Sequence, residues 1–139
     1  MDEAAFWSDD PAKRSLSDRW MDWSETALQP DFLMGVFWGF YRTPEQQRNL
    51  LKIRKSIDRC AGHFQLLDRL LAYQEFMLGS EFTLADIPIG TNLYRYFNIE
   101  IERPSLPNVE EWYRHLQDRP AYRKYVMVPF GELHGRLAY

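Results

Sequence analysis

The beginning of a helix is encoded at Phe82-Thr83-Leu84-Ala85-Asp86-Ile87. Thr83 stands at the N-cap and Asp86 follows three residues later, so each side chain can accept a hydrogen bond from the other residue's backbone N–H. Asp is a shorter equivalent of the Glu or Gln that usually closes this capping box. Phe82 before the cap and Ile87 after it predict a hydrophobic staple. We therefore expect a helix that starts at Thr83.

The residues that follow are apolar on nearly every side of a helix, and Arg95 is the one charge in the later turns. Pro88 falls near the first turn, where a missing N–H costs little. Gly90 leaves room for a neighbouring element to approach closely. Because a helix that is apolar all round must be buried, we predict an all-α bundle around this central helix. Its apolar positions are Leu84, Ile87, Ile89, Leu93, Tyr94 and Phe97.

Residues 1–14 predict a lead-in segment that docks on the body through Phe6 and Trp7. Ser15 or Ser17 can then cap a first helix. Its apolar stripe continues until Pro30 and Asp31 interrupt it, and a second helical piece follows at an angle. The stripe positions of the two pieces are Trp20, Trp23, Ala27 and Leu28, then Phe32, Phe37, Trp38 and Tyr41.

Thr43 and Pro44 predict the start of a long helix, with Thr43 as the cap and Pro44 in the first position. Its apolar residues repeat at helical spacing over about eight turns. Gly62 in its middle marks a bend or a close contact. The stripe comprises Leu50, Ile53, Ile57, Cys60 or Ala61, Phe64, Leu67 and Leu71.

The C-terminal third predicts short elements. A loop over 99–108 leads to a helix that opens at Pro107 or Asn108, and Pro120 restarts another short helix. The tail, 129–139, is expected to be irregular. No alternation of polar and apolar residues persists anywhere, which favours helices over strands throughout.

Composition narrows the class of protein. The 139 residues are 45% hydrophobic and 16% aromatic, which is typical of one globular domain spanning 1–139. A net charge of −3 argues against a nucleic-acid partner. The single cysteine and the acidic start, without a signal-peptide pattern, predict a cytoplasmic protein. The longest apolar run, 32–41, is too short to span a membrane.

Catalytic and metal-binding patterns are missing. His63, His115 and His134 are far apart, and no spacing typical of a metal site occurs, so no metal is expected. Cys60 lies within an amphipathic helix, which favours a buried, inert thiol over a reactive one. The aromatic group on the first helical pieces can be plain core or the lining of an apolar cavity. No catalytic residue is predicted.

Ordered blocks of residues carry a family resemblance. The stretch 78–87 resembles the capping box and staple of the glutathione S-transferase C-terminal domain. The stretches 103–109, 112–113 and 119–122 are similar to later parts of that domain, and 18–23 resembles its first long helix in bacterial, theta-like members. The resemblance covers nearly the whole chain.

The resemblance implies a fold and separate roles for two domains. In such enzymes an N-terminal thioredoxin-like domain supplies the glutathione contacts, and the co-substrate is glutathione. The helical domain supplies the wall of the hydrophobic electrophile site and half of a homodimer interface, while the counterpart of Asp86 caps the core helix. By position, the resemblance places seven residues near the electrophile, namely Trp20, Trp23, Ser24, Ala27, Phe37, Trp38 and Phe130.

Three functions remain open at this point. The chain can be the helical part of a glutathione transferase whose thioredoxin-like domain lies in the parent protein or in a second polypeptide. It can be a stand-alone module for dimerisation or protein contact, without catalysis. It can also be a ligand carrier that uses its aromatic residues as a pocket.

Overall fold

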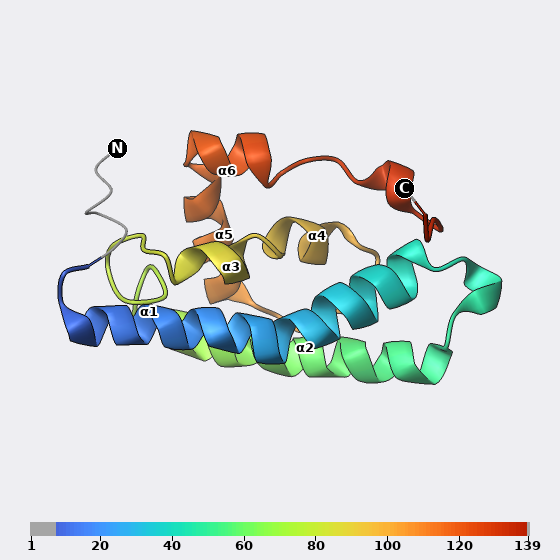
Figure 1. Cartoon of the computed structure of the whole chain (residues 1–139), viewed down its shortest axis with the longest axis horizontal. Coiled ribbons are helices and arrows are strands. Elements are labelled where there is room, and N and C mark those ends of the chain that lie inside the picture. The colour runs from blue at the N-terminus through green and yellow to red at the C-terminus, as the bar shows by residue number, and fades with distance from the viewer. Residues whose placement is uncertain (1–7, 139) are drawn as a thin grey trace.

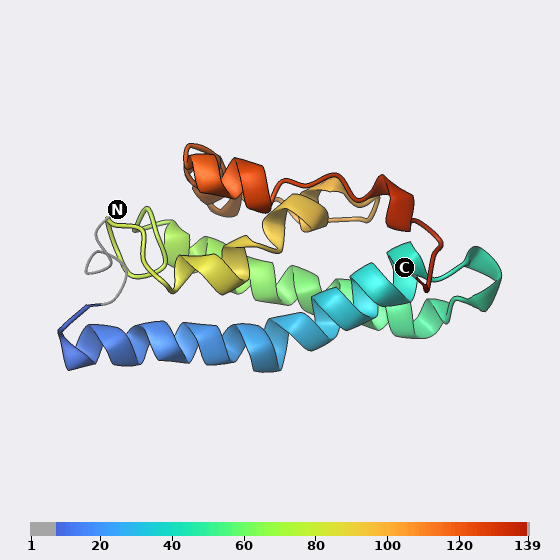
Figure 2. The same cartoon turned by 45° about the horizontal axis from the view of Figure 1, so that its top comes forward.

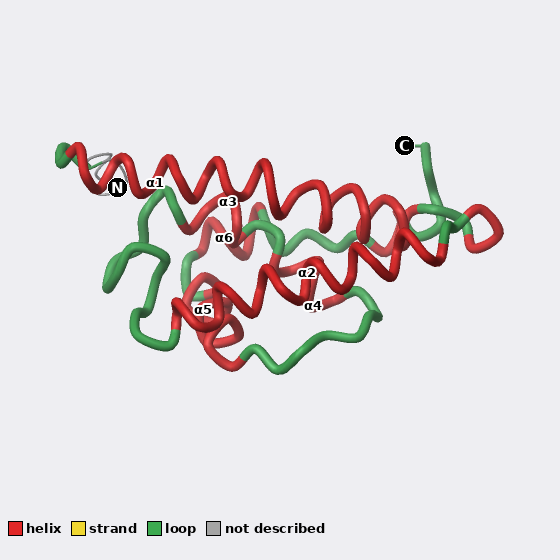
Figure 3. The backbone as a smooth tube through the Cα atoms, turned by 90° about the horizontal axis from the view of Figure 1, so that it is seen from below, coloured by secondary structure: helices red, strands yellow, loops and turns green. Residues whose placement is uncertain are grey.

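The computed structural model describes residues 8–138, and within this range the chain forms helices and loops but no strand (Figure 3). The all-α prediction is therefore confirmed. Segments η2 and η3 are π-helical, and η4 and η5 are single 3₁₀ turns. The elements in chain order are α1 (Pro11–Trp23), η2 (Ser24–Leu28), η3 (Pro30–Arg42), η4 (Glu45–Gln47), α2 (Leu50–Leu71), α3 (Asp86–Gly90), α4 (Leu93–Asn98), α5 (Pro107–Gln117), α6 (Pro120–Tyr125) and η5 (Gly131–Leu133).

The first helix begins earlier than predicted. Asp10 is its N-cap, because the carboxylate accepts the N–H of Ala12 at 3.0 Å, and Pro11 occupies the first position. The prediction of a cap at Ser15 or Ser17 is thus wrong, and so is a lead-in segment as long as 1–14. Phe6 and Trp7, which were expected to dock on the body, lie outside the described residues.

Pro30 does not interrupt the first helix, contrary to the prediction. The chain runs from α1 through η2 into η3 as one long helical rod that changes direction midway (Figure 2). The N–H of Gln29 bonds the carbonyl of Ser24, five residues back, so the turns ahead of Pro30 are widened. Such widening accommodates a residue without an N–H while helical hydrogen bonding continues around it.

The long helix α2 begins at Leu50, not at Thr43, and spans 22 residues, or about six turns. The side chain of Asn49 caps it by accepting the N–H of Lys52 at 3.1 Å. Leu50 is 73% exposed and does not belong to the buried stripe. Gly62 marks no close contact, since a Cβ placed there would meet open space. The buried face of α2 comprises Ile53, Ser56, Cys60, Phe64, Leu67 and Leu71.

The predicted central helix is two short helices, α3 and α4, and it begins at Asp86 instead of Thr83. The break follows from Pro88, whose carbonyl accepts the hydroxyl of Thr91 at 3.0 Å and the side-chain amide of Asn92 at 2.9 Å. The backbone N–H of Asn92 bonds Ile89 instead, which tightens the turn. The helix pair α3 and α4 is buried on one side only, as the 41% exposure of Ile87 shows.

The helices form two layers. The rod α1–η3 packs beside α2, α3 and α4 lie across this pair, and α5 packs directly on α2 with α6 beside it (Figure 1). Gly90 allows the predicted close approach, since a Cβ there would lie 2.8 Å from the Leu116 side chain of α5. The ring of Tyr96 stacks on Phe64 with centroids 4.1 Å apart and fills the space between the layers.

Two contacts fix the C-terminal half of the chain. The Asp68 carboxylate of α2 accepts the N–H groups of Asn108 and Val109 at 2.8 and 3.0 Å, and so caps α5 from a neighbouring helix. The tail is irregular apart from η5. It returns to the end of η3, where the N–H of Gly135 bonds the carbonyl of Tyr41 at 2.9 Å.

Candidate functional site

Asp86 is the best-connected polar residue near α3. Its carboxylate is fully buried and accepts the N–H of Met77 at 2.8 Å, the N–H of Thr83 at 2.8 Å and the indole N–H of Trp112 at 3.0 Å. Burial raises the pKa of this carboxyl above its ordinary value of 3.8, although the hydrogen bonds act in the opposite direction. With its lone pairs directed at these donors, Asp86 joins a loop, α3 and α5 and presents no surface for chemistry.

Only one half of the expected reciprocal cap has the geometry of a capping box. Asp86 accepts the N–H of Thr83, as a box requires. The hydroxyl of Thr83 accepts the N–H of Ala85 at 3.3 Å, and the N–H of Asp86 bonds the backbone carbonyl of Thr83 instead. Phe82 and Ile87, the expected staple pair, line one common pocket.

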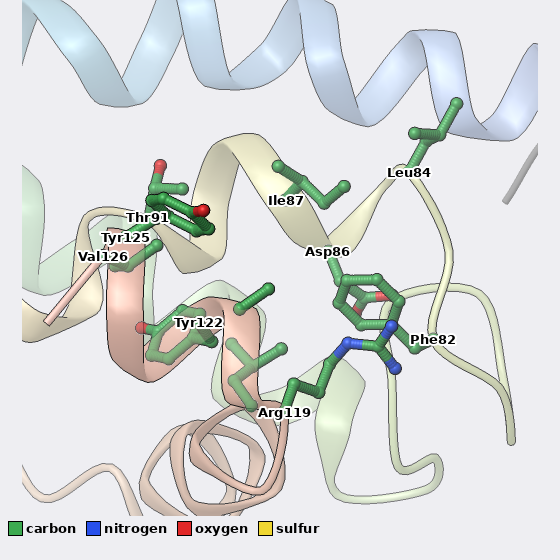
Figure 4. Close-up of a pocket in the computed structure, with 11 residues that line it drawn as sticks. Phe82, Leu84, Asp86, Ile87, Thr91, Arg119, Tyr122, Tyr125 and Val126 are labelled. Carbon is green, nitrogen blue, oxygen red and sulfur yellow. The ribbon is translucent and has the colours of Figure 1, made fainter. Parts of the chain in front are cut away.

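This pocket of about 300 Å³ lies between α3 and α6 (Figure 4). The guanidinium of Arg119 lies 3.9 Å from the centre of the Phe82 ring at one end. Ile87 is 41% exposed and Tyr125 is 70% exposed, so the surface around the pocket offers apolar area to solvent. Its lining is Phe82, Leu84, Asp86, Ile87, Thr91, Leu116, Arg119, Ala121, Tyr122, Tyr125 and Val126.

The residues that the resemblance placed near the electrophile fall into two groups. Trp20 and Trp23 form the first group on α1, with ring centroids 5.6 Å apart at 79°. Together with Leu16 and Arg19 they line a hollow of about 310 Å³. Trp23 also contacts the edge of His63, which bonds Asp31 at 2.7 Å.

The second group is an aromatic cluster beneath the tail. Phe37 and Phe130 are 2% and 7% exposed, with ring centroids 6.0 Å apart. Tyr41 contacts both rings, with its centroid 5.8 Å from that of Phe37 and 5.1 Å from that of Phe130. The guanidinium of Arg95 lies 4.1 Å from the centre of the Phe37 ring. We call Phe37, Tyr41, Tyr94, Arg95 and Phe130 the tail cluster.

The two groups do not meet. Trp23 and Phe37 are separated by about 20 Å along the rod, at 1.5 Å for each helical residue. Ser24 is fully buried and faces neither the hollow nor the tail cluster, while Ala27 is half-buried beside it. Trp38 is half-buried, with the guanidinium of Arg42 at 3.9 Å from its ring centre.

Sequence reasoning missed three members of the tail cluster as well as the polar end of the pocket. Tyr41 and Tyr94 were stripe positions and Arg95 was the one charge of the central helix, all without a role in a site. Arg119 and Tyr125 were assigned to the short helix restarted at Arg119-Pro120. No local pattern could identify them, because the tail and α6 reach their partners only through tertiary contacts.

Neither metal-ion nor catalytic geometry is found in the described part of the chain. Among residues 8–138, no three His, Cys, Asp or Glu side chains come together as metal ligands. Cys60 is fully buried, and burial together with the charge of Asp31 raises the pKa of its thiol to about 12. No described helix has the length and apolar character needed to cross a membrane.

The family model of the glutathione S-transferase C-terminal domain matches residues 21–115. The chain belongs to this family. Over 123 residues it is 38% identical to glutathione S-transferase GstB of Escherichia coli K12, which covers 88% of this chain and 59% of GstB. The chain therefore spans less than two thirds of that relative's length.

Two further comparisons bear on structure and function. The theta-class glutathione S-transferase of the citrus canker pathogen Xanthomonas axonopodis pv. citri, solved with glutathione bound, is similar with a TM-score of 0.85 and 38% identity. The similarity covers 90% of this chain and 60% of that one. A probable elongation factor 1-gamma of Caenorhabditis elegans is 24% identical over 109 residues, which are 76% of this chain and 27% of that protein.

Proposed function

We propose that this chain is the helical half of a cytoplasmic glutathione transferase and supplies the wall of its electrophile site. The observation that carries the proposal is the 38% identity to a theta-class enzyme solved with glutathione bound, across 90% of this chain but only 60% of that one. The remaining part, a thioredoxin-like domain, provides the glutathione site in the parent protein or in a second polypeptide.

The tail cluster is the part of the chain that we assign to the electrophile wall. It joins residues of η3, α4 and the tail into one aromatic cluster that carries a cation, Arg95. Aromatic side chains with a few polar groups are typical of small-molecule sites. Because Trp20 and Trp23 lie far from this cluster, we assign them to a separate contact on α1.

The pocket between α3 and α6 is the surface that we assign to the thioredoxin-like domain. An apolar pocket flanked by exposed Ile87 and Tyr125 favours a protein partner over water. The other face of the molecule, along η3 and α2, exposes Met34, Leu50 and Leu51 by 60%, 73% and 70%. We assign that face to the homodimer interface.

The decisive experiment compares the chain alone with the chain joined to a thioredoxin-like transferase domain. Glutathione is titrated into each protein by calorimetry, and turnover is measured with 1-chloro-2,4-dinitrobenzene. We expect neither heat nor turnover from the chain alone, and both from the joined protein. Turnover by the chain alone would mean that it contains its own thiol site, and an inactive joined protein would contradict the proposed function.

Variants in the joined protein test the assignment of the wall. Phe130→Ala should raise the KM for the aryl halide by about tenfold, since truncating a packed aromatic side chain at a contact costs more than 1 kcal/mol. Trp23→Ala is the matched control and should leave this KM unchanged. Equal effects of the two substitutions would contradict the assignment.

A non-catalytic interaction module is the second candidate function. The similarity to a probable elongation factor 1-gamma favours it, because that protein is not named as a transferase. An inactive joined protein that still forms a stable dimer through η3 and α2 would support this candidate. A ligand carrier would instead bind the aryl halide without turnover.

A further inference from the structure

Two consecutive residues at the end of η3 hold the tail by several hydrogen bonds. The carbonyl of Tyr41 accepts the N–H of Gly135 at 2.9 Å, and its hydroxyl donates to the carbonyl of Phe130 at 3.3 Å. The guanidinium of Arg42 donates to the carbonyls of Arg136 at 2.8 Å and Ala138 at 3.5 Å. We call Tyr41 and Arg42 the tail clasp.

Arg42 is an unusual residue for this position, because its side chain is only 1% exposed. Transfer of a cation into a protein interior is costly unless its donors are used. The planar guanidinium meets this condition by facing tail carbonyls along its edge while its face covers the Trp38 ring at 3.9 Å. A lysine side chain has neither the fork of donors nor the flat face.

The clasp bonds the tail at Phe130 and again after η5. Phe130 is the first aromatic residue of the tail, and its ring packs against Tyr41 and Tyr94 with centroids 5.1 and 5.7 Å apart. Its carbonyl is held by Tyr41, and the segment that follows is held by Arg42. The clasp thus bonds the tail on both sides of η5, while the Phe130 ring itself contacts Tyr41, Tyr94 and the guanidinium of Arg95.

We propose that Tyr41 and Arg42 are positioning residues, which hold residues 130–138 on η3 and so place Phe130 in the electrophile wall. This inference rests on the proposed function for its last step only. The alternative is that burial of Phe130 holds the tail by itself and the clasp bonds add nothing to its position.

Hydrogen exchange of the full chain tests the clasp directly. Arg42→Met keeps the length of the side chain and removes its donors. We expect the backbone N–H of Gly135 to exchange about tenfold faster, because charge-assisted hydrogen bonds are lost. The exchange rate of the backbone N–H of Trp112 in α5 should stay unchanged. Arg48→Met is the matched control, because Arg48 donates to Thr43 and lies over Phe40 at the same end of the molecule.

Two further variants, Tyr41→Phe and Arg42→Lys, test the clasp independently. Tyr41→Phe removes one hydroxyl without opening the core, and about threefold faster exchange at Gly135 is expected if Arg42→Met does not fold. Arg42→Lys should recover only part of the protection. Unchanged exchange at Gly135 in both Arg42→Met and Tyr41→Phe would overturn the clasp.

The joined protein tests the functional step. Arg42→Met should raise the KM for the aryl halide about fivefold and leave the KM for glutathione unchanged, because only the electrophile wall moves. Faster exchange with an unchanged aryl-halide KM would overturn the positioning role. An inactive wild-type joined protein would instead disprove the proposed function, and hydrogen exchange would then decide alone whether the clasp holds the tail.

Discussion

The buried carboxylate of Asp86 shows how one side chain can join several segments. It accepts hydrogen bonds from the loop at Met77, from Thr83 ahead of α3 and from Trp112 on α5. All three are donors, so an acceptor-only group fits the site and an amide does not. The residue is therefore a structural acceptor, even though carboxylates in other buried sites often act as acids or bases.

Asp86→Asn should destabilise the fold by about 3 kcal/mol, because one side-chain position becomes an N–H donor that faces other donors. The midpoint of thermal unfolding should fall by about 10 °C. Differential scanning calorimetry of the chain measures both. Asp118→Asn, at an exposed position, is the control and should change little. A fall below about 1 kcal/mol would mean that the site tolerates a donor.

Cys60 should be inert to thiol reagents in the folded chain. Its pKa of about 12, against an ordinary 9.0, leaves about a thousandfold less thiolate at pH 8, and the side chain is fully buried. The rate with Ellman's reagent should rise about tenfold for each pH unit toward 12, as long as the protein stays folded. Urea-unfolded chain provides the reference rate, and a native rate within tenfold of it would contradict this expectation.

Helix α5 obtains its N-terminal cap from another helix. Leu106, at the N-cap, makes no side-chain capping bond, and the Asp68 carboxylate of α2 takes the free N–H groups of Asn108 and Val109. The side-chain amide of Asn108 returns a bond to the carbonyl of Asp68 at 3.1 Å. One acidic side chain thus sets both the start of α5 and its place on α2.

Asp68→Ala should lower the free energy of unfolding by about 1–2 kcal/mol, the usual cost of losing an N-cap. Urea unfolding monitored by circular dichroism measures this change. Asp58→Ala on the same helix is the matched control, because Asp58 is 71% exposed in its side chain and its pair with Arg54 is at the surface. If the two variants were equally stable, Asp68 would not cap α5.

At the scale of the whole molecule, the described helices leave an apolar pocket open to solvent between α3 and α6. The Ile87→Glu variant of this chain should bind a separately added thioredoxin-like domain at least tenfold more weakly, because the new carboxylate would be desolvated against an apolar partner. Calorimetry measures the binding. Tyr73→Glu, at a residue that is 93% exposed and does not line the pocket, is the control. Unchanged binding by Ile87→Glu would mean that the partner binds another face of the chain.

The fold class and the rough order of helices could be predicted from the sequence, because apolar spacing and caps act within a few residues. The boundaries could not be predicted as well. Asn49 caps α2 where Thr43 was expected to, since a short 3₁₀ turn lies between them. The predicted central helix is divided because side chains of Thr91 and Asn92 take the carbonyl of Pro88.

The sequence by itself determined that this protein is all-helical and that Asp86 is a capping residue, because periodicity and local hydrogen bonding depend on neighbouring residues. Ordered blocks of residues carried its resemblance to the glutathione S-transferase C-terminal domain. Only the tertiary structure decided that Phe37 and Phe130 meet while Trp20 and Trp23 lie elsewhere. Contacts between a tail and a distant helix depend on how the chain closes on itself, and no spacing of residues in the sequence records that.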